Sequence, residues 1–221
     1  MVIAGPPKGN KSTDEKLIPV IEKNIETLRR ISPDDLGQRS GVRIGKNGLL
    51  LDAFFQTFVI DTETFAITTD SGTPVPLLFR SIALTYLAKA DGTPPSNKLI
   101  HFRELPGGGN YASAFQGYAP NSLTRHFGQD IDGFIASCKR VGGRPAEFGD
   151  AAFTFDLFPK IPITVIYYLG EEAFPPAASL LFDANVHHYM VTDGLATVGK
   201  RLVDIIIENH PENSGSNWKS G

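Results

Sequence analysis

The stretch that decides the fold class is Phe153-Thr154-Phe155-Asp156-Leu157, followed by Ile163-Thr164-Val165-Ile166-Tyr167-Tyr168. In the first segment apolar residues alternate with polar ones, which is typical of a strand with one buried face. The second segment is almost continuously apolar and β-branched, which is typical of a central strand. Because the link at residues 159–162 is short, the two strands are predicted to pair as an antiparallel hairpin.

A second strand region lies earlier in the chain. The dipeptide Asn47-Gly48 is a tight-turn signal, and it separates two segments rich in β-branched and aromatic residues. Connections of this length indicate antiparallel hairpins. Strands are predicted at residues 42–45, 49–55, 58–61 and 65–69, and a further one at residues 99–103.

Between the strand regions, apolar residues recur at helical spacing, and glycines follow several of these segments as typical helix ends. Helices are predicted at residues 17–28, 33–41, 74–90, 111–116, 122–141 and 192–209. Strands therefore come in clusters and do not alternate strictly with helices. This order predicts an α+β fold in which four to six helices pack against antiparallel sheet regions.

The length of 221 residues suits one large domain or two small ones. No linker-like composition interrupts the middle of the chain. We therefore predict a single domain over residues 14–209, with flexible tails at residues 1–13 and 211–221. Both tails are rich in polar and turn-forming residues.

Composition excludes several classes of protein. A hydrophobic content of 41% argues against a wholly disordered chain, and a net charge of -3 argues against a nucleic-acid partner. No apolar run is long enough to span a membrane, and Met1-Val2-Ile3-Ala4 is too short for a signal peptide, so a cytoplasmic protein is expected. The single cysteine, Cys138, lies on the apolar face of its predicted helix and indicates an inert buried thiol.

The most unusual segment is a glycine-rich turn between the predicted strand at 99–103 and the short helix at 111–116. Gly107, Gly108 and Gly109 form its centre, with Arg103 before them and Tyr111 after them. The glycine spacing is similar to that of a dinucleotide fingerprint, but no βαβ unit surrounds it. Two interpretations remain: an anion site assisted by the arginine, or a tight structural turn.

Histidines are sparse, and the adjacent pair His187 and His188 is the main candidate for metal binding. A protein metal site needs three or four converging ligands, and the local spacing does not supply them. Asp183 and Glu104 would have to join the pair through the fold. A single axial ligand to a macrocycle needs only one histidine, while the alternative is a pair of loop or partly buried side chains.

Several phrases, taken in order, resemble one uncharacterised domain-of-unknown-function family of anaerobic bacteria and archaea, over residues 14–209. They are Phe102-Arg103-Glu104-Leu105-Pro106-Gly107-Gly108, Phe148-Gly149-Asp150-Ala151-Ala152-Phe153, Leu157-Phe158-Pro159-Lys160-Ile161-Pro162, Glu171-Glu172-Ala173-Phe174-Pro175 and Leu180-Leu181-Phe182-Asp183. Some relatives carry a four-cysteine iron–sulfur module, and some are encoded near corrinoid and one-carbon enzymes. With one cysteine, this chain holds no such cluster. The resemblance implies anaerobic metabolism, handling of a corrinoid or related tetrapyrrole, and a protein partner in one-carbon or corrinoid metabolism.

Three functions follow as hypotheses. The leading one is a cofactor-binding protein for a corrinoid (cobalamin) or haem. In it Arg103 and the glycine turn meet carboxylate or phosphate groups, and His187 or His188 is the axial ligand. The second is a metal-assisted hydrolase or transferase that uses these histidines with Asp183 and Glu104. The third is a ligand-free accessory module that docks on a larger enzyme. A visible absorption band, tightly bound metal or co-purification with a partner would distinguish them.

Overall fold

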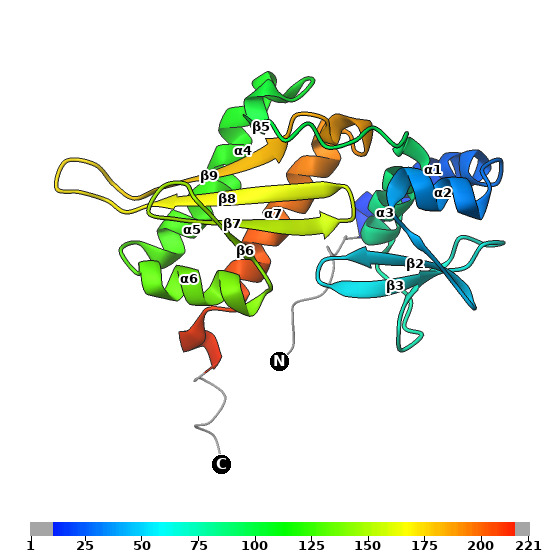
Figure 1. Cartoon of the computed structure of the whole chain (residues 1–221), viewed down its shortest axis with the longest axis horizontal. Helices are drawn as coiled ribbons and strands as arrows, with labels where there is room; N and C mark the ends of the chain where they lie inside the picture. Colours follow the sequence, from blue (N-terminus) through cyan, green and yellow to red (C-terminus); the bar gives the residue numbers. More distant parts are fainter. Residues whose placement is uncertain (1–10, 215–221) are drawn as a thin grey trace, which may run out of the picture.

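The computed structural model describes residues 11–214, with side chains over residues 15–213. It confirms the predicted α+β class, with two antiparallel sheets of strand order β1-β2-β3-β4 and β5-β9-β8-β7-β6 (Figure 1). Most of the two predicted tails lies outside the described residues. The ordered elements reach a few residues into both of them, because α1 begins at Lys11 and a final 3-10 helix, η4, covers Pro211–Ser214.

The first half of the chain builds the four-stranded sheet and the helices beside it. Ser32 caps α2, because its hydroxyl accepts from the Asp35 N–H at 3.1 Å. Strand β2 ends earlier than predicted because Phe54 and Phe55, both at positive φ, form the turn into β3. The elements are α1 (Lys11–Leu28), α2 (Pro33–Ser40), β1 (Arg43–Gly45), β2 (Gly48–Ala53), β3 (Gln56–Ile60), β4 (Ile67–Thr69) and α3 (Leu77–Lys89).

The second half builds the five-stranded sheet around the predicted hairpin. Strands β7 and β8 pair antiparallel with Phe153 opposite Val165, which confirms that hairpin. The sequence reading missed β6 and β9, which extend the sheet on either side. The strands are β5 (Leu99–His101), β6 (Arg144–Ala146), β7 (Ala151–Phe158), β8 (Ile161–Tyr168) and β9 (Ala177–Asp183).

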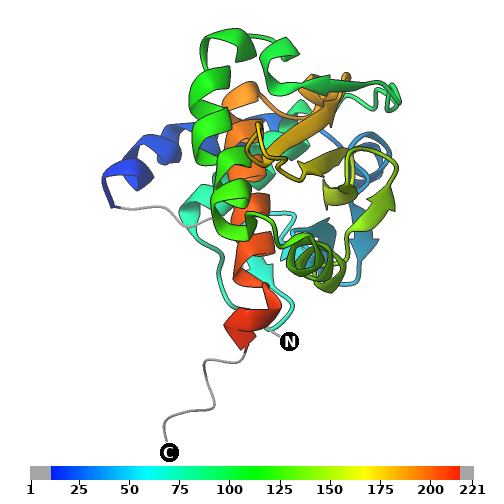
Figure 2. The same ribbon diagram turned by 90° about the vertical axis from the view of Figure 1, so that its left-hand side faces the viewer.

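Helices cover one face of this sheet, as the view turned by 90° shows for α4, α5 and α7 (Figure 2). The predicted helix at residues 122–141 is wrong in one respect, because it is two helices. Gly128 adopts a φ of 53° and ends the first, and the Asp130 carboxylate caps the second by accepting from the Gly133 N–H at 2.8 Å. The helices are α4 (Ala112–Tyr118), α5 (Pro120–Phe127), α6 (Ile131–Arg140) and α7 (Thr192–Glu208).

The two sheets meet at the turn between β2 and β3. The Phe54 N–H donates to the Leu157 carbonyl of β7 at 3.1 Å. The Phe158 ring lies 5.7 Å from the Phe54 ring and 4.8 Å from the Tyr86 ring of α3, centroid to centroid. All four residues are fully buried in one continuous hydrophobic core.

Among residues 11–214, no helix combines the length and apolar character needed to cross a bilayer.

Candidate functional site

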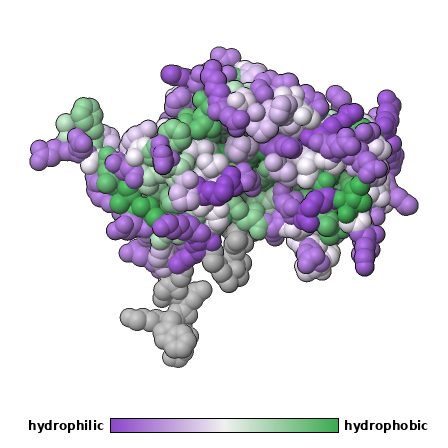
Figure 3. All heavy atoms as spheres, viewed as in Figure 1, coloured by the Kyte–Doolittle hydropathy of each residue, from purple (hydrophilic) through white to green (hydrophobic). Residues whose placement is uncertain are grey.

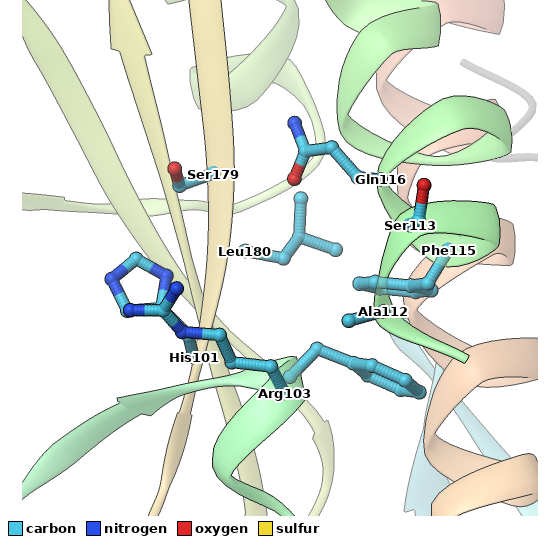
Figure 4. A pocket seen from close by; sticks show the side chains of 9 residues that line it. His101, Arg103, Ala112, Ser113, Phe115, Gln116, Ser179 and Leu180 are labelled. Atoms are coloured by element: carbon cyan, nitrogen blue, oxygen red, sulfur yellow. The ribbon is translucent and has the colours of Figure 1, made fainter. Parts of the chain in front are cut away.

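A cavity of about 440 Å³ opens between the 3-10 helix Phe102–Glu104 (η1), helix α4 and strand β9 (Figure 4). Its floor is apolar: the Phe102 and Phe115 rings stack with centroids 4.1 Å apart, and the Leu180 side chain points between β9 and α4. A volume of this size is typical of small-molecule sites. Its rim is polar and consists of His101, Arg103, Ser113, Gln116 and Ser179.

Arg103 is the one predicted site residue that lines this cavity. Its side chain is exposed, and within the described part of the chain no carboxylate lies within 4.0 Å of its guanidinium. In Figure 4 the side chain extends along the cavity toward His101. A guanidinium with no internal counter-ion is available for bidentate contacts with a carboxylate or phosphate.

One edge of β9 faces β5 and helix α4. The Ala184 N–H donates to the Lys98 carbonyl at 2.9 Å, and the Gln116 side-chain amide donates to the Ala178 carbonyl at 3.1 Å. Since backbone polar groups alternate between the two edges of a strand, Leu180 directs its N–H to this same edge. Strand β5 ends at His101, opposite Leu181, and Leu180 lines the cavity together with Arg103.

The glycine-rich turn supports the wall of the cavity. Gly107 has a φ of 77°, and Gly108 lies directly against the Phe102 carbonyl, which confirms that this segment needs glycine. The group nearest to Gly108 is therefore the backbone of Phe102. The Thr192 hydroxyl of α7 donates to the Pro106 carbonyl at 2.7 Å and fixes the turn to the helix layer. Its geometry is that of a tight structural turn.

Tyr111 does not line the cavity. Its ring is 41% exposed, and its centroid lies 6.0 Å from that of Tyr118. The Tyr118 hydroxyl donates to the Tyr111 hydroxyl at 3.2 Å. Burial raises the pKa of Tyr118 well above its ordinary value, so the Tyr118 hydroxyl keeps its proton at physiological pH.

The two adjacent histidines lie on a short 3-10 helix, η3 (Val186–His188), directly after β9. His188 Nδ1 lies 2.6 Å from an Asp91 carboxylate oxygen, and His187 Nδ1 lies 2.9 Å from the Ala184 carbonyl oxygen. The hydrogen bond to His188 is the largest cause that lowers the pKa of Asp91. Neither histidine lines the cavity of Arg103, so the structure does not bring the two parts of the predicted macrocycle site into one cavity.

Asp183 and Glu104 have structural partners. The buried Asp183 carboxylate accepts from the backbone N–H groups of Ser96, Asn97 and Asn185 at 3.0, 2.9 and 2.8 Å. The Glu104 carboxylate accepts from the His101 N–H at 2.8 Å. Over residues 11–214, no group of three or more histidine, cysteine, aspartate or glutamate side chains is placed to hold a metal ion. The predicted grouping of these two acids with the histidines is therefore not assembled there.

Sequence reasoning missed the residues that α4 and β9 contribute to the cavity. Ser113 and Gln116 sit on a helix of seven residues, and Ser179 sits on a strand that the pattern did not reveal. No local sequence signal links Asp91 to His188, which lies 97 residues further along the chain. Cys138 is fully buried, and burial raises the pKa of its thiol, as expected for an inert cysteine.

Comparison with known proteins gives one match. Residues 32–205, about four fifths of the chain, match the model of a family described as a domain of unknown function (DUF3786). No curated protein matches the chain. No solved structure matches it either.

Proposed function

The chain belongs to the DUF3786 family, a domain of unknown function, and we propose that it is a ligand-binding protein whose ligand is an organic anion. The observation that carries this proposal is the Arg103 guanidinium, which belongs to a cavity with an apolar floor and has no internal counter-ion among the described residues. A charged donor beside stacked aromatic rings suits a ligand with a carboxylate and an apolar body.

The donors around the cavity favour an anion over a cation. Besides the Arg103 guanidinium, the Ser113 and Ser179 hydroxyls lie on the rim. Among the residues that the structure describes, no carboxylate lines the cavity. A carboxylate ligand would receive charge-assisted hydrogen bonds here, which are about twice as strong as neutral ones. The Gln116 side chain spans to β9 and limits the length of the site along the strand.

The narrower form of the proposal is a tetrapyrrole, a corrinoid or haem, as the family resemblance implies. Such a macrocycle carries carboxylate or amide arms around a flat ring. The cavity suits one arm, held by Arg103, with the ring across the open mouth. When bound, the macrocycle would supply metal-centred chemistry, while this chain would hold and orient it. His187 and His188 lie outside the cavity, so the arm contact is the part of this hypothesis that the geometry supports.

The test is a binding titration with hydroxocobalamin, haemin and metal-free protoporphyrin, followed by absorbance, and with a panel of aromatic carboxylates, followed by ligand-observed NMR. Arg103→Gln should weaken binding at least ten-fold, whereas Arg39→Gln should not change it. Arg39 is the matched control because it is also exposed and has no ion pair in the described structure.

The outcomes separate the two levels of the proposal. If carboxylates bind and no macrocycle does, the anion site stands and the tetrapyrrole is wrong. If Arg103→Gln binds every ligand as tightly as the wild type, the cavity is not the site. If the wild type binds none of these ligands, the ligand-binding proposal itself fails.

A second candidate, the accessory module, is favoured by the hairpin between β8 and β9, which projects from one end of the molecule (Figure 1). Phe174 near its tip is 71% exposed, and Glu171 and Glu172 precede it. In Figure 3 apolar and hydrophilic atoms meet at this end. Exposed aromatic residues beside acids suit a protein surface with basic groups around an apolar hollow. A partner that the wild type retains at low salt and Phe174→Ser loses would support this role.

A further inference from the structure

The pair His187 and His188 has a feature that the cavity of Arg103 does not explain. The Ala184 carbonyl oxygen can only accept a hydrogen bond, so His187 Nδ1 must carry the proton at their 2.9 Å contact. The Asp91 carboxylate accepts in the same way from His188 Nδ1 at 2.6 Å. In neutral imidazole the other nitrogen then has a lone pair, so both Nε2 atoms are free acceptors.

Hydrogen bonds of this kind are usual for histidines that bind a metal. Histidines that ligate metals generally donate their other ring N–H to a carboxylate or a backbone carbonyl, which fixes the tautomer and the ring orientation. Here one histidine has the carboxylate and its neighbour has the carbonyl. Asp91 is itself held, because its other oxygen accepts from the Thr93 N–H at 2.9 Å. The His188 side chain is 32% exposed, so solvent ions reach it.

The two rings lie close enough to share one ion when both Nε2 atoms face it. Their centroids lie 4.3 Å apart. With a nitrogen–metal distance of about 2.1 Å, each centroid would lie roughly 3.2 Å from the ion, so a separation of 4.3 Å gives an angle of about 85° at the ion. That angle fits neighbouring positions of an octahedral or square-planar ion better than the wider angle of a tetrahedral zinc site.

We propose that His187 and His188 form an open two-histidine site for a divalent transition-metal ion of octahedral or square-planar preference, such as Ni²⁺, with Asp91 as the positioning residue for His188. The remaining coordination positions are open to water or to a ligand, because no third protein ligand joins the pair among residues 11–214. The site is separate from the cavity of Arg103 and does not rest on the function proposed there.

The experiment is a calorimetric titration of the full chain, without a histidine tag, with Ni²⁺. The wild type should bind one ion. His187→Ala and His188→Ala should each weaken binding at least ten-fold, and Asp91→Asn should weaken it about ten-fold through the loss of orientation. His101→Ala, which removes an exposed histidine of the other cavity, is the matched control and should bind as the wild type does.

Nitrogen-15 spectra of the metal-free wild type provide a test that does not depend on the stability of any variant. In their neutral form both histidines should show a protonated Nδ1 and a bare Nε2. The proposal is overturned if either neutral ring carries its proton on Nε2, if the wild type does not bind Ni²⁺, or if both alanine variants bind it unchanged. Loss of binding in His101→Ala alone would also overturn it, because the ion would then lie in the other cavity.

Discussion

A Cβ atom on Gly108 would lie 2.0 Å from the carbonyl oxygen of Phe102. No side chain fits at that distance, so the turn after η1 packs on the backbone of η1 itself. The contact sets the position of Phe102, whose ring forms the floor of the cavity, and of Arg103, which follows it. The glycine-rich segment thus acts on the site through packing, and its glycines differ sharply in what they tolerate.

The first prediction compares two neighbouring glycines. Gly108→Ala should lower the free energy of unfolding by about 1–3 kcal/mol, because backbone must move to make room for the methyl group. Gly109→Ala is the matched control, since a Cβ there meets its nearest atom at 3.8 Å, an ordinary contact, and φ is not positive. Urea unfolding followed by circular dichroism measures both. Equal stability of the two variants would show that the turn does not pack as described.

The second prediction concerns the junction of the two sheets. Phe158 belongs to the five-stranded sheet, yet its ring packs on Phe54 of the β2–β3 turn and on Tyr86 of α3. Because one core joins both halves, the chain should unfold in a single cooperative transition, and Phe158→Ala should lower its stability by about 3–5 kcal/mol.

The measurement for this prediction is thermal unfolding by calorimetry with circular dichroism at two wavelengths. Phe148→Ala is a suitable control, because that ring is 46% exposed and should contribute less than about 1 kcal/mol. Two separate transitions in the wild type, one for each sheet, would contradict the shared core.

The fold class is readable from the sequence because the strongest local signal, the β7–β8 hairpin, coincides with the centre of a sheet. The sequence pattern does not predict strand β9, and the reason is physical. Its sequence is rich in alanine and leucine, which locally favour a helix, and pairing with β8 on one side and β5 on the other overrides that preference. Long-range pairing of this kind leaves no periodic trace in the segment itself.

The candidate site was predictable in part for the same reason. Arg103 and the glycine turn are neighbours in sequence, so a local pattern indicates both. Ser179 reaches the cavity from β9, far along the chain, and Asp91 meets His188 across 97 residues. Such contacts depend on the register of strands and on loop paths, which a single sequence does not reveal.

The third prediction concerns Asp130, which caps α6 and also contacts His210 beyond α7, with Oδ2 and Nε2 3.0 Å apart. The Gly133 N–H, and then His210, lower the pKa of Asp130, so the stabilisation is present above about pH 4 and is lost as pH falls through the lowered value. His126 and Glu212 are the other titratable groups whose charges act within this cluster.

Two substitutions separate the roles of this carboxylate. Asp130→Ala removes the cap and should cost about 1 kcal/mol at pH 7. Asp130→Asn keeps a good capping side chain and removes only the charge, so it should cost less. Both variants should lose less stability than the wild type between pH 5 and pH 2.5 in urea titrations. If either variant lost more stability than the wild type between pH 5 and pH 2.5, the role given to the Asp130 carboxylate would be wrong.

The last prediction concerns stability at high pH, where the hydroxyl of Tyr167 loses its proton. Tyr167 is fully buried, its ring lies 4.7 Å from that of Phe134, and its hydroxyl donates to the Gly128 carbonyl at 2.8 Å. Burial, and then the charge of Asp130, raise the pKa of Tyr167 to about 12. Because the folded pKa lies above the unfolded one of about 10, the contribution of Tyr167 to stability is complete below pH 10 and is lost as pH rises toward 12.

Tyr167→Phe should cost about 1 kcal/mol at pH 8, since it leaves the Gly128 carbonyl without its donor. The gap to the wild type should then narrow between pH 10 and pH 12, where urea unfolding is measured at fixed ionic strength. Tyr168→Phe is the matched control, because that neighbouring ring is 42% exposed, and it should follow the wild type throughout. A constant gap for Tyr167→Phe across this range would mean that its hydroxyl does not stay protonated in the folded core.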